Sequence, residues 1–333
     1  MNDPRIVAWL AIFGVALAAP PALAQTKPDA AEAPPAPVEA SLAVGALQIG
    51  SAANLAIAGV DIHVEKDSVT YSYFLKNAGT AEVGFTAAVS LPELQASGDR
   101  SETWTLASND PENFVGLTIT SAGAPVTTKA EVHAYSLGLD RLAEIKAEHL
   151  PLIPFGPELD KTLAALSPDA AARLAALGLI SPREAGQKTP PVPDWSFSVV
   201  RTWRQVLPPG KTTPVVIKFT PVKGHYRLVK DDQQGLDDMK DDFCLKPETL
   251  RALQSRLQGT GAWKVTEIAL SHDAPARWID SPRPTLSVQK PKPDVIVAFC
   301  GMDDKSAGKP SVFGAAPEDS NETRVVIFDP AAN

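Results

Sequence analysis

A regular alternation of apolar and polar side chains between residues 60 and 89 constrains the fold of this chain more than any other feature. Apolar side chains occupy every second position from 69 to 75 and again from 83 to 89, on either side of an Asn-Ala-Gly turn at 77–79. Successive side chains of a strand point to opposite faces, so the pattern predicts an antiparallel sheet with one dry and one polar face. Such a sheet is typical of one layer of a β-sandwich.

Further strands are predicted on both sides of the middle of the chain. Residues 113–137 predict two more strands around a Ser-Ala-Gly-Ala-Pro turn, and residues 195–222 predict two strands joined at Pro208-Pro209-Gly210. Segments 263–271 and 293–301 are expected to close the second sheet. The chain is therefore predicted to contain two β regions, which span residues 41–137 and 187–303.

The apolar period changes from two to that of a helix after Gly138. Ser-Pro pairs at 167–168 and 181–182 are typical of helix N-termini, and Glu184 lies three residues beyond the second serine. We therefore predict a small all-helical insert of three or four short helices over residues 138–186.

One C-terminal helix is predicted over residues 247–258. Pro247 lies in its first turn and Gly259 follows its last residue. Residues 304–333 are interpreted as a tail with a short terminal strand. The predicted fold class is α+β, mainly β, with antiparallel β-sandwich-like sheets, the helical insert and this single helix.

The N-terminus has the organisation of a secretory signal peptide over residues 1–24. Arg5 precedes an apolar run from 6 to 19, and Ala22-Leu23-Ala24 supplies a small-x-small cleavage site. The run is short for a membrane span, so no stable membrane insertion is expected after cleavage. The Ala/Pro-rich residues 25–40 predict a spacer, and we expect a periplasmic or secreted protein.

Two cysteines, Cys244 and Cys300, each follow a phenylalanine. In an oxidising compartment two neighbouring thiols form a disulfide, which is the favoured interpretation; the alternative is two separate buried thiols. Closing a loop of about 57 residues would contribute roughly 4 kcal/mol. The bridge would join the start of the C-terminal helix to a strand, with α-carbons about 4.4 to 6.8 Å apart and the flanking phenylalanines around the sulfurs.

The net charge of −8 disfavours nucleic acid and anionic membranes as partners, because both require clustered lysine and arginine. An envelope protein or a small ligand is the expected partner. The five histidines have no metal-ligand spacing, and no phosphate-binding loop, dinucleotide fingerprint or nucleophile elbow occurs. We therefore expect no cofactor and assign no catalytic or metal-binding residue.

An acidic stretch at residues 231–242 is the one charged cluster. We interpret it as a solvated loop, with a calcium site and a glycosidase-like acid pair as alternatives. Its aspartates are Asp231, Asp232, Asp237, Asp238, Asp241 and Asp242.

Several motifs resemble a known family. They are Trp104, Asn-Phe-Val-Gly at 113–116, Trp-Arg-Gln at 203–205 with its Pro-Gly turn, and Phe-Cys-Leu-Lys-Pro-Glu-Thr at 243–249. With the helical insert, they resemble exported proteobacterial proteins catalogued as a domain of unknown function, number 4424 in that series, over about residues 45–303. The resemblance implies export, one continuous two-sheet body and no cofactor, and it supplies no catalytic residues.

Three classes of function remain. A non-enzymatic periplasmic binding or protein-interaction module is favoured, because sandwich sheets present loops and edges for contact. The second class is a structural or assembly factor of the cell envelope. The third is a hydrolase whose site converges only in three dimensions, with His225, Asp238, Asp241 and His272 as the first candidates.

Overall fold

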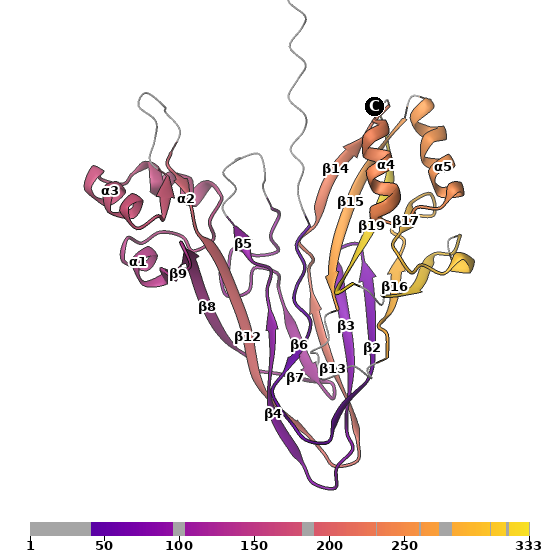
Figure 1. Ribbon diagram of the computed structural model, residues 1–333, viewed down its shortest axis with the longest axis horizontal. Coiled ribbons are helices and arrows are strands. Elements are labelled where there is room, and N and C mark those ends of the chain that lie inside the picture. The colour runs from indigo at the N-terminus through magenta and orange to yellow at the C-terminus, as the bar shows by residue number, and fades with distance from the viewer. Residues whose placement is uncertain are drawn as a thin grey trace, which may run out of the picture. The chain divides into compact units, whose positions relative to one another are not determined.

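The structure is a computed structural model, and the bounds and absences given below refer to the residues that it describes (Figure 1). These are residues 41–95, 104–181, 190–230, 232–259, 261–272, 282–306, 308–317 and 320–332. The expected signal peptide, the spacer and the helix expected after Ser181 lie outside them.

The first half of the alternating segment lies at the centre of a seven-stranded sheet with the order β18-β16-β2-β3-β13-β6-β7. The second half, residues 83–89, belongs to the other sheet, so the prediction of one sheet across the turn at 77–79 is wrong. The strands are β2 (Leu55–Glu65), β3 (Ser68–Asn77), β6 (Thr118–Ser121), β7 (Ala124–Pro125), β13 (Thr212–Phe219), β16 (Thr285–Gln289) and β18 (Ser311–Ala315). Val69, Tyr71, Tyr73 and Leu75 are all buried on β3, as the alternation predicts. Every pairing is antiparallel except that of β16 with β2.

A six-stranded sheet supplies the other half of the main core. Its order is β1-β4-β12-β8-β9, with β5 also paired to β12. The strands are β1 (Gln48–Ile49), β4 (Val83–Ser90), β5 (Leu94–Gln95), β8 (Lys129–Ser136), β9 (Leu139–Asp140) and β12 (Ser196–Leu207). Phe85, Phe197 and Trp203 from this sheet join Tyr73 and Ile217 from the seven-stranded sheet in one apolar cluster. The mainly β, α+β fold class is thereby confirmed.

Buried Asn77 ties together two connections that pass from one sheet to the other, β3 to β4 and β12 to β13. Its Nδ2 donates to the carbonyl oxygens of Ala81 at 2.9 Å and Leu207 at 3.1 Å. Its Oδ1 accepts from the amide of Gly79 at 2.9 Å, and the carbonyl oxygen of Gly79 accepts from the amide of Gly210 at 3.1 Å. One side chain therefore satisfies backbone groups on both connections.

Asn77→Ala should lower the free energy of unfolding by about 2–3 kcal/mol, because it leaves buried backbone groups without their partner. Urea denaturation would measure this change. Exposed Thr80, in the same turn, provides the matched control, and Thr80→Ala should stay within about 0.5 kcal/mol. Equal effects of the two substitutions would show that the Asn77 side chain does not hold the connections.

Four strands, in the order β14-β15-β19-β17, form a third sheet that shares no strand with the other two. Its strands are β14 (Gly224–Leu228), β15 (Gly261–Ser271), β17 (Ile296–Ala298) and β19 (Glu322–Ala332), and helices α4 (Gln233–Asp242) and α5 (Pro247–Gln258) lie beside it (Figure 1). Leu236, Phe243 and Leu253 pack with Trp263 and Phe328 in a second apolar cluster between helices and sheet. Ile268 and Ile327 belong instead to the main core, so this sheet is buried on both faces.

The helical insert contains α1 (Leu142–Ala147), α2 (Pro157–Ala164) and α3 (Pro168–Ala176), followed by the two-stranded sheet of β10 (Ile180–Ser181) and β11 (Val192–Pro193). Ser167 caps α3, as its Ser-Pro sequence predicts, and accepts a hydrogen bond from the amide of Ala170 at 3.2 Å. Ile145, Leu159 and Leu174 anchor the insert in the main core. None of the helices in the described residues is both long and apolar enough to cross a membrane.

The interpretation of the acidic stretch as a loop is wrong, because residues 233–242 form helix α4. Asp232 caps this helix by accepting from the amide of Gly235 at 3.0 Å, and Leu236 and Met239 are buried three residues apart. The narrow apolar stripe was obscured by the surrounding aspartates. The C-terminal part of the described chain therefore has two helices where one was expected.

Two expectations about the last strands also need correction. Segments 263–271 and 293–301 do not close the second sheet; their strands β15 and β17 pair with β19 in the four-stranded sheet. The residues after Asp304 include β18 and the 11-residue β19, which is longer than the expected terminal strand. Because β19 is buried on both faces, it lacks the period-two alternation that would have revealed it.

Candidate functional site

The predicted disulfide between Cys244 and Cys300 is confirmed. Cys244 lies in the connection between α4 and α5, and Cys300 lies two residues beyond the end of β17. Their α-carbons are 5.1 Å apart, within the expected interval. The bridge therefore joins a helix–helix connection to the end of a strand.

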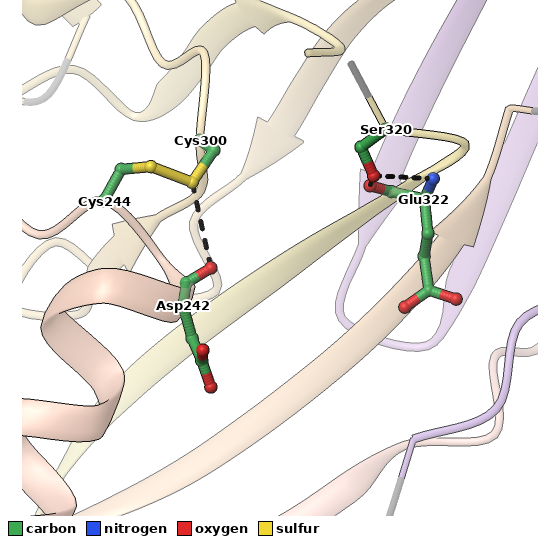
Figure 2. The surroundings of a disulfide bond; sticks show 5 residues. All are labelled: Asp242, Cys244, Cys300, Ser320 and Glu322. Atoms are coloured by element: carbon green, nitrogen blue, oxygen red, sulfur yellow. Dashed lines mark hydrogen bonds between the residues drawn. A yellow bond between two sulfur atoms is a disulfide. The ribbon is translucent and has the colours of Figure 1, made fainter. Parts of the chain in front are cut away.

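The sulfurs are not enclosed by the flanking phenylalanines, contrary to expectation. Phe243 and Phe299 are each 2% exposed, but they belong to different apolar clusters. Cys244 is exposed and Cys300 is half-buried. Figure 2 shows Cys300 Sγ facing the carbonyl oxygen of Asp242, at 3.8 Å. A disulfide sulfur has no proton to donate, so this is a contact of the bridge with the end of α4.

A cleft lies beside the disulfide, with a volume of about 830 Å³. The end of α4, the turn after β17, the segment before β16 and the first residues of β19 contribute to its wall. The charged side chains and the two sulfurs that line it come from Asp242, Cys244, Arg283, Cys300, Glu322 and Arg324. We call these six residues and the space between them the disulfide cleft.

Arg324 is the electrostatic centre of the disulfide cleft. Its guanidinium lies 2.7 Å from the carboxylate of Glu267, 3.8 Å from that of Asp242 and 3.9 Å from that of Glu322. The Glu267 side chain is only 9% exposed and also accepts a hydrogen bond from Ser41 Oγ at 2.7 Å. Glu267 is therefore the strongly engaged partner, whereas Asp242 and Glu322 stand farther from the guanidinium.

Burial, and to a smaller extent the carboxylates paired with Arg324, raises the pKa of two tyrosines. Burial raises the pKa of Tyr226 well above its usual value, and the carboxylate of Glu267 raises it further. Burial likewise raises the pKa of Tyr71, with smaller contributions from Tyr73 and from the carboxylate of Glu322. Both hydroxyls therefore remain protonated at neutral pH, and neither adds a negative charge beside the cleft.

Arg283 and Lys246 supply further positive charge near the cleft. Nε and Nη2 of Arg283 both donate to the carbonyl oxygen of Ala316, at 3.1 and 2.7 Å. Lys246, at the start of α5, forms an ion pair with Asp304. This pair joins the same two segments of the chain that the disulfide joins.

The four residues suggested by sequence for a hydrolytic site do not lie in the disulfide cleft. Asp238 and Asp241 are exposed on α4, and Asp238 accepts a hydrogen bond from Gln234 at 2.7 Å. His225 is paired in register with Thr266 on β15, whereas His272 follows the end of that strand. Six residues of extended strand span about 20 Å, so the two histidines do not share a site.

Sequence reasoning missed Glu267, Arg283, Glu322 and Arg324. The available signal was the pair Glu322 and Arg324, which occupy alternate positions and hence one face at the start of a strand that continues with four apolar residues. Residues 304–333 are predicted to form a tail, and in a tail this alternation does not indicate a site. Within the described ranges, no three His, Cys, Asp or Glu side chains are grouped so as to hold a metal ion.

The fold and the cleft define a mainly β, disulfide-bonded α+β protein with a charged surface cleft. The chain belongs to the family described as Domain of unknown function (DUF4424), which matches residues 38–321. This match confirms the resemblance found in the sequence and extends it to the residue before β19.

Among solved structures, the chain is similar to a "putative nutrient binding protein" from Legionella pneumophila subsp. pneumophila. The two are 11% identical, with a TM-score of 0.44, and the similarity covers 87% of this chain and 72% of that chain. No curated protein matches the chain.

Proposed function

We propose that this protein is an exported binding module that holds a small polar ligand with an ammonium group in the disulfide cleft. The observation that carries the proposal is the excess of carboxylates around Arg324: three surround one guanidinium. Glu267 does not line the cleft, but at 2.7 Å it is the carboxylate that offsets the charge of Arg324. The lining carboxylates Asp242 and Glu322 then stand against the guanidinium of Arg283 alone. The cleft therefore favours a positively charged ligand group.

Asp242 and Glu322 are the carboxylates available to such a group. Their distances from Arg324, 3.8 and 3.9 Å, exceed the roughly 2.7–2.9 Å of a charge-assisted hydrogen bond. Their side chains are 57% and 49% exposed. An ammonium group has three donors and no acceptor, so either carboxylate can accept a hydrogen bond from it.

The size of the cleft also supports a small-molecule ligand. Its volume, about 830 Å³, lies within the roughly 300–1,000 Å³ that is usual for ligand sites. Its lining is more charged than that of most such sites, which favours a polar ligand over an apolar one. Export to the periplasm or beyond is supported by the signal-peptide sequence of residues 1–24 and by the disulfide, which is stable in an oxidising compartment.

Amino acids, diamines and short peptides, screened by calorimetric titration, should include a ligand that binds in the disulfide cleft. The double substitution Asp242→Asn/Glu322→Gln should weaken that ligand at least tenfold, because it removes the two carboxylates that face the ammonium group. Asp238→Asn provides the matched control, since Asp238 also lies on α4 but outside the cleft. Unchanged affinity in the double variant, or the same loss in the control, would refute the proposed site.

A second candidate function, protein interaction, is favoured by the β8–β9 hairpin. On this hairpin Tyr135 is 39% exposed, Leu137 79% and Leu139 54%. Exposed apolar side chains grouped in this way are typical of contact surfaces. A photo-crosslinking residue at position 139 should capture a defined envelope protein in intact cells, and one at exposed Lys264 should not. Equal capture from both positions would argue against the hairpin as the contact surface.

A further inference from the structure

The Cys244–Cys300 disulfide differs from a purely structural bridge in its exposure. Cys244 is exposed, Cys300 is half-buried, and both line the disulfide cleft. We propose that this bridge is a thiol–disulfide exchange site of the folded protein, which a dithiol reduces without unfolding the chain. Accessibility to the attacking thiolate is the first requirement of such exchange, and the cleft meets it.

The backbone at Cys244 provides a second, independent observation. Its φ is +50°, in the left-handed region that L-residues other than glycine, asparagine and aspartate rarely adopt. The residue is held there between α4 and α5 while its sulfur is bonded to Cys300. This conformation ends α4, because the amide of Leu245 donates to the carbonyl oxygen of Lys240 at 2.9 Å across Cys244. The backbone cap does not depend on the bridge, so it keeps Cys244 at the surface before and after reduction.

The exchange proceeds in two displacements. A thiolate of the dithiol attacks Sγ of Cys244, the more exposed of the two residues. An intermolecular disulfide forms, the Cys244–Cys300 bond breaks, and Cys300 leaves as a thiolate that takes up a proton. The second thiolate of the dithiol then attacks the first sulfur of the same dithiol, which is bonded to Cys244 in the mixed disulfide. Cys244 leaves as a thiolate and is protonated. Two electrons pass from the dithiol, which ends as a disulfide, to the protein, which ends with two thiols.

Other contacts between the joined segments explain why the reduced protein stays folded. Phe243 and Phe299 remain anchored in their separate apolar clusters, and Lys246 remains paired with Asp304. Reduction therefore loosens the wall of the disulfide cleft without releasing either segment from the core. That looser wall would weaken ligand binding, a consequence that rests on the function proposed above.

The test is the rate at which dithiothreitol reduces the folded protein, followed by alkylation and mass measurement. Exchange in the native state predicts a rate proportional to reductant concentration, about tenfold faster at tenfold higher dithiothreitol. Circular dichroism should show that the reduced product keeps its β-sheet signal. A rate that becomes independent of dithiothreitol, at the value of the unfolding rate, would overturn the proposal, because it would mean that the bridge is reached only through opening of the fold.

Two core variants separate native exchange from opening. Leu253→Val loosens the helix–sheet cluster and Ile145→Val loosens the main core, and each should raise the population of opened molecules several-fold. Native exchange predicts reduction rates within twofold of the wild type in both variants. A several-fold acceleration in either would overturn the proposal. The kinetics are read without any ligand, so a failure of the proposed ligand function leaves this test intact.

Discussion

Phe328→Ala should lower the free energy of unfolding by about 3–5 kcal/mol, because it removes a large side chain from a closely packed site. Phe328 on β19 is 0% exposed and lies edge-on to Trp263, with ring centroids 6.2 Å apart. It fills the cluster that attaches α4 and α5 to the four-stranded sheet. Guanidinium denaturation, followed by tryptophan fluorescence, would measure the change.

The matched control is Phe313→Ala, which makes the same chemical change on β18, where the side chain is 48% exposed. Its effect should remain under about 1 kcal/mol, because little apolar area returns to water. If the two substitutions destabilised the protein equally, the helix–sheet cluster would not be the compact core that its burial indicates.

Cys300→Ser should destabilise the protein by roughly 4 kcal/mol, because the sequence separation of 56 residues makes the loop closed by the bridge long. The main effect falls on the unfolded chain, which regains the conformations that the bridge had excluded. Denaturation in the absence of reductant would measure it. The protein should remain folded at 25 °C, but with a reduced yield of folded protein.

The control for this prediction uses the wild type in excess dithiothreitol. Once its bridge is reduced, the wild type should match Cys300→Ser within about 1 kcal/mol. A large difference that persists in reductant would mean that the serine damages the site in some other way, and the stabilisation could not be assigned to the bridge.

The strands of the main core could be predicted because each has one dry face. The alternation at Val69, Tyr71, Tyr73 and Leu75 reports that environment directly. The β19 strand could not be found in the same way, because Val325, Val326, Ile327 and Phe328 are all buried and one face packs on helices. A strand buried on both faces shows an apolar run with no period of its own.

The candidate site was predictable only in its covalent part. Two cysteines in a chain with a predicted signal peptide indicate a bridge, whatever the fold, and the bridge marks where the cleft lies. The pairing of Arg324 with Glu267, 57 residues earlier in the chain, depends on strand register, which no local pattern specifies. The acidic stretch is dense in charge, but most of its aspartates lie on the exposed face of α4, and among those that the structure describes only Asp242 lines the cleft.

The central claim, that the disulfide cleft is the binding site, is tested most directly by mapping amide chemical shifts as an ammonium-bearing ligand from the screen is titrated in. The largest shifts should occur at residues 242–246, 300–301 and 322–324, which surround Arg324. Residues of α2, at 157–164, should not move. Shifts confined to the β8–β9 hairpin at 135–140, or spread over the surface with no focus at the cleft, would contradict the claim.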